Sequence, residues 1–188
     1  MFDFDLLEKE VEKIGSIINA PMSLLIVRTF PIGDGTPHVE FKDDECFYVS
    51  SERGHEFYRE KITDLNELLY RIFNRVTTRM AMDYELAHRV ESQDCRRLIF
   101  NKKLELLGKI SPDWEDRERR EITKTLIRSP YDDLASVRAD YCRQLRNSGI
   151  SETDIDKLTY KKYPSPQKNM QGSPQKQSKT FWEKYFDK

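Results

Sequence analysis

The sequence has few cysteines and no long apolar run, and each shortage excludes a class of protein. Its three cysteines, Cys46, Cys95 and Cys142, are odd in number, widely spaced and without a CxxC pair. This pattern does not fit a secreted disulfide framework and indicates reduced thiols. No stretch approaches the roughly 18 apolar residues of a membrane-spanning helix, and the acidic N-terminus does not resemble a signal peptide. We therefore expect a cytoplasmic protein that does not contact a membrane.

Recognisable catalytic motifs are also missing. The sequence contains no Gly-rich phosphate loop, GxSxG elbow, HExxH or nucleophilic Cys-His context. His38-Val39-Glu40 matches the HxE fragment of zinc deaminases, but the PCxxC that should accompany it is absent. Strand alternation places His38 and Glu40 on one face in any case, so we interpret them as a surface pair. We expect no enzyme, cofactor or metal. A hydrolase or nucleotide-modifying enzyme with an unrecognised site is the alternative.

Charge is balanced overall and uneven along the chain. The formal net charge is −1, which is unlike a polycation, and we expect no direct nucleic-acid binding. Residues 1–60 carry 13 acidic and 6 basic residues, a balance of −7. The remainder, 20 acidic and 26 basic residues, has a balance of +6. Such asymmetry bears on partners rather than on fold.

The longest periodic segment runs from Thr63 to about Val90 and predicts a central helix. Asp64 followed three residues later by Glu67 has the form of a capping box at its start. The apolar face is too broad for a helix that solvent surrounds, so other elements must cover it. Residues at helical spacing on this face are Leu65, Leu69, Ile72, Val76 and Met80.

The flanking segments predict an α+β fold. Periodicity and turn residues indicate helices at 3–19, 95–107, 114–128 and 133–147, and strands at 23–30, 37–41, 46–51 and 55–61. We expect a small three- or four-stranded antiparallel sheet packed against a layer of about five helices.

We place the folded domain at residues 1–158 and a linker with an aromatic C-terminal segment at 159–188. The linker is rich in Lys, Pro, Gln and Ser and contains SPQK twice. The final aromatic cluster either packs on the domain as one amphipathic turn or has no fixed structure. Its residues are Phe181, Trp182, Tyr185 and Phe186.

Two further groups have structural interpretations. Asp94-Cys95-Arg96-Arg97 stands at a helix start, where we favour an ion pair between one arginine and Asp83 or Glu85 over a ligand site. Trp114, also at a helix start, is most simply a core residue.

The predicted turn between the first two meander strands is the best candidate for a binding surface. Its carboxylates lie among aromatic residues, so charge can steer a basic partner and the aromatic rings can anchor it. The alternative is a solvated hairpin tip. The candidate partner-binding residues are Phe41, Asp43, Asp44, Glu45, Phe47 and Tyr48.

An ordered series of segments resembles immunity protein family sixty-three of the bacterial polymorphic toxin systems. The series comprises GTPHVEF (35–41), YVSSERGHEF (48–57), DLNELLYRIFNRVT (64–77), YELAHRV (84–90) and QDCRRLIFNKKLELLGKISPDW (93–114). The resemblance covers roughly residues 20–130 and implies a cytoplasmic, non-enzymatic protein, encoded beside a toxin, that protects the cell by binding the toxin domain.

The resemblance leaves the toxin unidentified. The acidic N-terminal half would suit a basic toxin such as a nuclease. A general adaptor whose basic tail binds acidic partners is another interpretation.

Overall fold

A computed structural model describes residues 4–42 and 45–166, which form two compact units. The first unit comprises Met1–Val90 with Cys95–Thr125, and the second comprises Glu91–Asp94 with Leu126–Lys188. Among the described residues, no helix combines the length and apolar character needed to cross a membrane. The repeated SPQK segments, apart from Ser165 and Pro166, and the aromatic C-terminal segment lie outside these residues. The proposed boundary between 158 and 159 stays a prediction.

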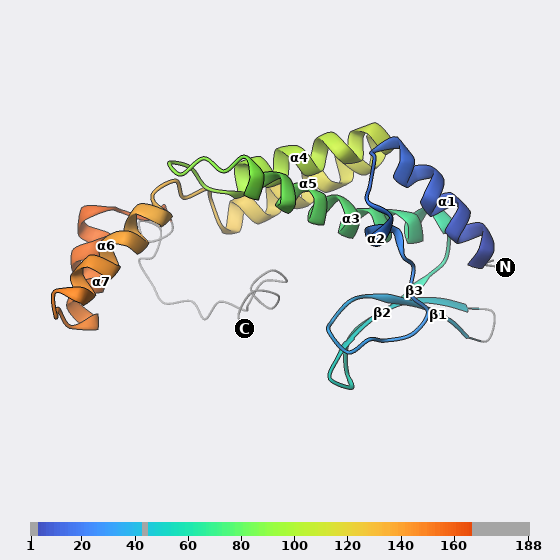
Figure 1. Ribbon diagram of the computed structural model, residues 1–188, viewed down its shortest axis with the longest axis horizontal. Helices are drawn as coiled ribbons and strands as arrows, with labels where there is room; N and C mark the ends of the chain where they lie inside the picture. Colours follow the sequence, from blue (N-terminus) through green and yellow to red (C-terminus); the bar gives the residue numbers. More distant parts are fainter. Residues whose placement is uncertain (1–3, 43–44, 167–188) are drawn as a thin grey trace. The chain divides into compact units, whose positions relative to one another are not determined.

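The first unit contains a three-stranded antiparallel meander in the order β1-β2-β3 (Figure 1). The strands are β1 His38–Lys42, β2 Glu45–Glu52 and β3 His55–Ile62. β2 and β3 are joined by Arg53 and Gly54, whose φ angles of 52° and 79° are the left-handed values that a two-residue hairpin turn requires. The three meander strands therefore form as predicted.

The central helix α3, Leu65–Ala87, packs its apolar side against the sheet. Asp64 caps it, since its side chain accepts a hydrogen bond from the Glu67 amide at 2.9 Å. Figure 1 shows the sheet on one side of α3 and helix α4 on the other. The core that joins them includes Val39, Cys46, Tyr48, Ile62, Leu68, Leu69, Ile72, Phe73 and Val76.

Loss of the Asp64 cap has a defined cost. We expect Asp64→Ala to lower the free energy of unfolding by about 1 kcal/mol, because an amide in the first turn loses its acceptor. Asp64→Ser keeps an acceptor and should recover most of that loss. Urea denaturation of the three proteins measures the difference, and equal stability of wild type and Asp64→Ala would contradict the capping role.

Three further helices complete the core of the first unit: α1 Phe4–Ile17, α4 Arg96–Ile110 and α5 Pro112–Arg128. The predicted end of α4 near Leu107 is early, because Gly108 lies inside the helix. A Cβ at Gly108 would lie 2.4 Å from Glu115 Oε2, the far end of a flexible side chain that would have to move. Together with the short α2 Met22–Leu25, these helices and the sheet confirm the α+β class.

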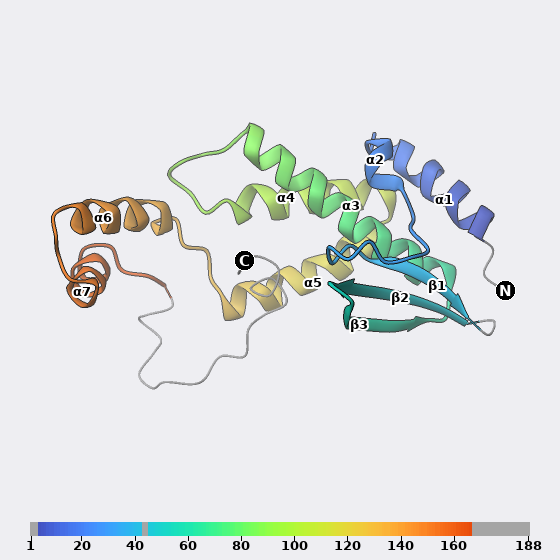
Figure 2. The same ribbon diagram turned by 60° about the horizontal axis from the view of Figure 1, so that its bottom comes forward.

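The strand predicted at 23–30 is wrong. Met22–Leu25 forms one helical turn, and the segment that follows is extended and runs beside β1 (Figure 2). Arg28 supplies one pairing contact, since its carbonyl accepts a hydrogen bond from the Val39 amide at 2.8 Å. The apolar run suggested a buried strand, but Ile26 and Phe30 are exposed. The described sheet therefore has three strands rather than four.

The second unit contains α6 Ala135–Asn147 and α7 Glu152–Lys162. The sequence predicted α6 but not α7. Ser151 caps α7 by accepting from the Asp154 amide at 3.3 Å, a start signal that sequence reading missed. Residues 159–162, assigned to the linker by composition, therefore continue a helix. Arg138 ties the unit together: it is buried, pairs with Asp132, and donates to the carbonyls of Tyr163 and Pro164 at 3.3 and 3.2 Å.

Candidate functional site

The predicted binding hairpin lies at the end of the sheet where β1 turns into β2. Phe41 is exposed and meets the Phe4 ring edge to face, with 6.3 Å between ring centroids. Glu45 forms an ion pair with Lys61 on β3. Asp43 and Asp44, the acidic centre of the prediction, lie outside the described residues. The described part of the hairpin therefore offers one exposed aromatic ring and one paired carboxylate.

Phe47 and Tyr48 lie on opposite faces of the sheet, as alternation along β2 requires. Phe47 is half-buried on the face away from the core, with the Arg59 guanidinium 5.2 Å from its ring centroid. Tyr48 is buried in the core and meets Tyr58 edge to face at 6.5 Å. Burial raises the pKa of Tyr58 to about 12. Of this pair, Phe47 is the side chain that can touch a partner directly.

Arg59 organises the outer face of the sheet around Phe47. It bonds the carboxylates of Glu40 and Glu56 at 2.9 and 2.7 Å. These contacts hold the pKa of both carboxyl groups below their ordinary value, with the Arg59 hydrogen bond as the largest cause. The outer face thus presents a half-buried aromatic ring beside charged side chains that ion pairs hold in place.

The HxE pair forms the contact that strand alternation predicts. His38 Nε2 lies 3.0 Å from Glu40 Oε1, and the same carboxylate pairs with Arg59. Unlike the surface pair expected, His38 itself is buried. In the part of the chain that the structure describes, no three His, Cys, Asp or Glu side chains gather closely enough to hold a metal ion.

The two structural interpretations from the sequence have different outcomes. Trp114 is buried, stacked on Phe73 at 6.2 Å and edge-on to Tyr70 at 5.9 Å, as a core residue should be. Asp83 and Glu85, proposed as partners for Arg96 or Arg97, pair with Arg79 and Arg89 of their own segment at 3.2 and 2.9 Å. The Asp94 carboxylate accepts from the Asp132 amide at 2.9 Å.

A buried polar network that the sequence reading missed joins α3, α4 and α5. The Lys103 ammonium and the Glu118 carboxylate lie 2.7 Å apart, with 3% and 7% of the residues exposed. Asn74 donates to Glu118 at 2.5 Å and accepts from Lys103 at 3.2 Å, and the Tyr70 hydroxyl donates to Glu118 at 3.3 Å. Burial lowers the pKa of Lys103. Each group points at another, so the network holds helices together.

The sequence of α4 contains a pattern that could have revealed part of this network. Phe100, Lys103, Leu104 and Leu107 follow the i, i+3, i+4, i+7 spacing of one buried helix face. A lysine within such a stripe requires a buried counter-charge. The spacing could have identified Lys103, but not the partner on α5.

A second chain of ion pairs ties β3, α3 and α5 nearer the surface. Arg71 bonds both Glu60 and Glu67 at 2.7 Å, and Arg117 bonds Glu67 at 2.5 and 3.0 Å. The Arg117 guanidinium also lies 3.9 Å from the Tyr70 ring centroid. The Arg117 hydrogen bond is the main reason that the pKa of Glu67 is lowered. These charges are satisfied within the unit.

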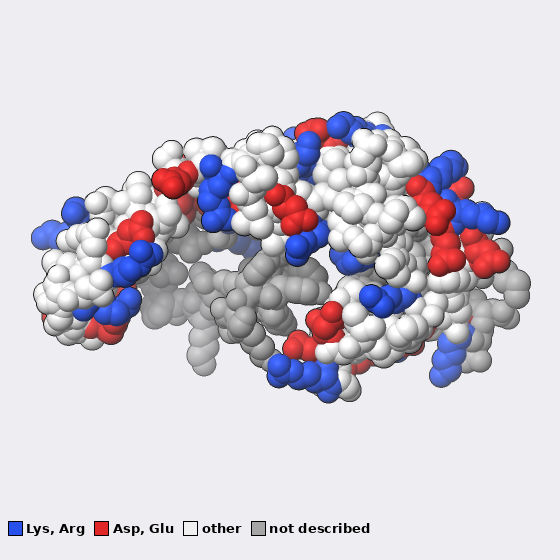
Figure 3. All heavy atoms as spheres, viewed as in Figure 1, with Lys and Arg blue, Asp and Glu red and all other residues white. Residues whose placement is uncertain are grey.

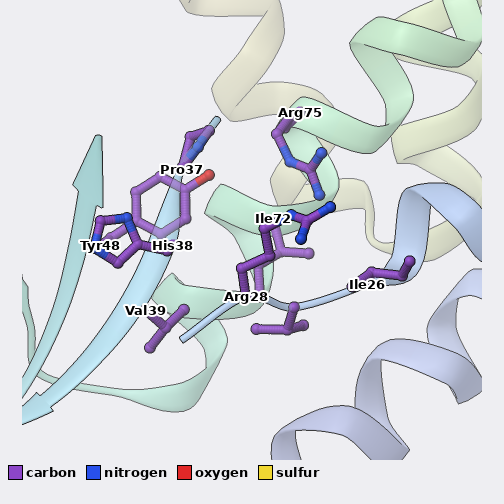
Figure 4. Close-up of a pocket in the computed structure, with 9 residues that line it drawn as sticks. Ile26, Arg28, Pro37, His38, Val39, Tyr48, Ile72 and Arg75 are labelled. Carbon is purple, nitrogen blue, oxygen red and sulfur yellow. The ribbon is translucent and has the colours of Figure 1, made fainter. Parts of the chain in front are cut away.

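A shallow hollow lies beside the start of β1 (Figure 4). It is bounded by the extended segment after α2, the beginning of β1 and one turn of α3. The side chains around it are both apolar and cationic, and none of the described residues that line it is acidic. The lining residues are Ile26, Val27, Arg28, Pro37, His38, Val39, Tyr48, Ile72 and Arg75.

These features define an α+β protein whose charged groups are largely paired within the fold. The family model described as Immunity protein 63 matches residues 43–124, which run from the β1–β2 turn into α5. The resemblance to that family is thereby confirmed. It implies an immunity protein directed against a toxin, and it suggests a non-enzymatic role. The chain matches no curated protein and no solved structure.

Proposed function

We propose that the chain neutralises a cognate bacterial polymorphic toxin by direct, stoichiometric binding in the cytoplasm. The observation that carries this proposal is the family match over residues 43–124. The matched residues contain β2, β3, α3 and α4 complete, so the match extends over the central layers of the first unit. An inhibitor of this kind needs a rigid complementary surface and no reaction centre.

The first unit has the rigidity that such a surface needs. The Lys103–Glu118 pair fixes α4 and α5 against Asn74 and Tyr70 of α3. The Glu60–Arg71 pair fixes β3 against α3. Fixed backbone and side chains reduce the entropy lost on binding, which favours a tight complex.

We place one contact with the toxin on the β1–β2 hairpin and the outer face of the sheet beside it. Phe41 and Phe47 supply aromatic area there, and Glu45 with the sequence neighbours Asp43 and Asp44 supplies negative charge. Tyr48 supports this surface from the core side. Acidic residues favour a basic partner, such as a nuclease-type toxin.

Co-expression with the toxin encoded beside this chain tests the function. We expect the chain to restore growth of cells that make the toxin and to co-purify with it. Removal of residues 167–188, which leaves α7 and the carbonyls bonded by Arg138 in place, should leave protection intact if the first unit carries the interface. Loss of binding on that deletion would favour an adaptor that acts through its tail, and no rescue by the full chain would reject the proposal.

Charge reversal at the hairpin tests the proposed contact. Replacing Asp43, Asp44 and Glu45 by lysine should weaken toxin binding by about tenfold or more at low salt, mainly through slower association. Reversal of three exposed acidic residues on α3 and α5, Asp83, Asp116 and Glu121, provides a matched control, since it makes the same change of charge on other elements. Titration calorimetry measures both. Unchanged affinity in the hairpin variant would move the contact elsewhere.

A further inference from the structure

The segment that sequence reading placed in a buried strand, together with its flanks, exposes four large apolar side chains, although Leu25 is buried and Leu24 and Val27 pack against the core. Met22, Ile26, Phe30 and Ile32 are 66, 55, 61 and 42% exposed. Between residues 14 and 33 the only charged side chain is Arg28, in a chain of which 35% of the residues are charged. In Figure 3 the surface around α2 is white, whereas that over α1 carries both signs of charge. Burial in the core does not explain the four exposed apolar side chains.

Two arginines without carboxylate partners adjoin the segment. Arg28 and Arg75 both line the hollow beside β1, and their guanidinium groups lie next to each other in the close-up (Figure 4). Arg75 donates to the Leu24 carbonyl at 3.1 Å. Arg28 attracts the Asp34 carboxylate, but this attraction is the smallest of the effects that lower the pKa of Asp34. Within the described residues, neither guanidinium forms an ion pair with a carboxylate.

This arrangement differs from that of other arginines in the same unit. Arg59, Arg71 and Arg117 each bond one or two carboxylates. Two adjacent half-buried guanidinium groups repel each other, and an external anion between them removes that repulsion. The planar donor pattern of arginine suits a carboxylate.

His38 also borders the hollow, but its imidazole lies on the other face of β1, where Nε2 contacts Glu40. Its buried Nδ1, which has no hydrogen-bond partner among the described residues, therefore does not contribute to the hollow.

We propose that residues 22–32, together with the Arg28–Arg75 hollow, form a docking surface for the toxin, and that an acidic side chain of the toxin sits between the two guanidinium groups. This inference rests on the proposed function and names a second contact for it. Exposed Met and Phe beside half-buried Arg, with no Lys, Glu or Asp, is the composition of an interface core. A toxin carboxylate flanked by apolar residues complements both the positive charge of Arg28 and Arg75 and the apolar side chains around them.

Affinity for the toxin encoded beside the chain tests this surface. Arg28→Glu and Arg75→Gln should each raise the Kd by about tenfold or more, because a desolvated charge loses its partner. Gln at 75 retains a donor for the Leu24 carbonyl, so the fold should be kept. Arg79→Glu is the matched control: it lies one turn along α3, is exposed and pairs with Asp83, and should change the Kd by about twofold or less.

A charge swap and a footprint complete the test. Reversing the contacting toxin carboxylate to lysine should restore binding to Arg28→Glu. In hydroxyl-radical footprinting of the wild-type complex, Met22 and Phe30 should become protected, whereas Leu86, exposed near the end of α3, should not.

The outcomes separate this inference from the proposed function. Failure of the wild-type chain to bind the toxin rejects the function itself. If the wild-type chain binds tightly, and folded Arg28→Glu and Arg75→Gln bind equally tightly while Met22 stays unprotected in the footprint, the docking surface is overturned and the proposed function is not. A wild-type dimer in light scattering that Arg28→Glu dissociates would assign the surface to self-association and would equally overturn the inference.

Discussion

Glu118→Gln should lower the free energy of unfolding by about 3–5 kcal/mol, because it leaves the Lys103 ammonium buried without a counter-charge. The substitution is nearly isosteric, so loss of packing contributes little. Lys103 lies 2.7 Å from the carboxylate in a site with 3% of the residue exposed. Chemical denaturation monitored by circular dichroism measures the loss. A loss below about 1 kcal/mol would show that the pair does not hold the helices.

A double variant separates charge from packing. Lys103→Met combined with Glu118→Leu removes both charges, and we expect it to regain most of the stability that Glu118→Gln loses, because apolar replacements of a buried pair are often close to neutral. Asn74 and Tyr70 then lose a partner, so recovery should be incomplete.

The pH dependence of Glu118→Gln follows from the same charge. Burial already lowers the pKa of Lys103, and Glu118 opposes that shift. Without Glu118 the folded-state pKa falls further below the unfolded value. The unfolded state then holds more protons at intermediate pH, so stability rises with pH. We expect the deficit of Glu118→Gln relative to wild type to narrow as the pH rises toward the ordinary pKa of lysine, about 10.4.

Trp114→Ala should cost about 3–5 kcal/mol, the range for removing a large buried aromatic side chain. Trp114 joins α5 to α3 through ring contacts with Phe73 and Tyr70 at 6.2 and 5.9 Å. Its loss leaves a cavity beside the polar network as well as losing buried apolar area. Thermal unfolding and urea midpoints measure the effect.

Two controls bracket the Trp114 result. Trp114→Phe keeps one ring and should cost distinctly less than alanine. Ile127→Ala removes a side chain that is 74% exposed and should change stability by no more than about 0.5 kcal/mol. Similar losses for Trp114→Ala and Ile127→Ala would mean that the tryptophan does not join the helices.

Local signals were sufficient for most of the first unit. The Asp64–Glu67 box and an uninterrupted apolar stripe located α3, and alternation with turn residues located the meander. Each of these elements has one face on the core, so its period in the sequence reports its structure directly. The family resemblance rested on the same segments and is confirmed over residues 43–124.

The failures have physical causes. An apolar run such as 23–30 suggests a buried strand, but apolar composition does not distinguish burial in the core from exposure at the surface. α7 was missed because its apolar positions are few: the buried residues are Ile155 and Thr159. The Lys103–Glu118 pair joins residues on different helices, and no spacing within one helix specifies such a partner.

The sequence placed the candidate binding site only in part. It named Phe47 and Tyr48 together, and the structure separates them: Tyr48 is in the core, whereas Phe47 lies on the other face beside Arg59. It gave no indication that Arg28 and Arg75 line one hollow, because 47 positions separate them in the chain. Six residues of the hairpin stay a prediction for the toxin contact, two of them outside the described residues.

Titration of toxin activity with rising amounts of the purified chain tests the central claim most directly. Stoichiometric inhibition predicts that activity falls linearly and reaches its minimum at a fixed molar equivalence, with a complex of the same composition on size-exclusion chromatography. Complete loss of activity at a small fraction of an equivalent, progressing with time and without a complex, would show turnover and contradict inhibition by binding.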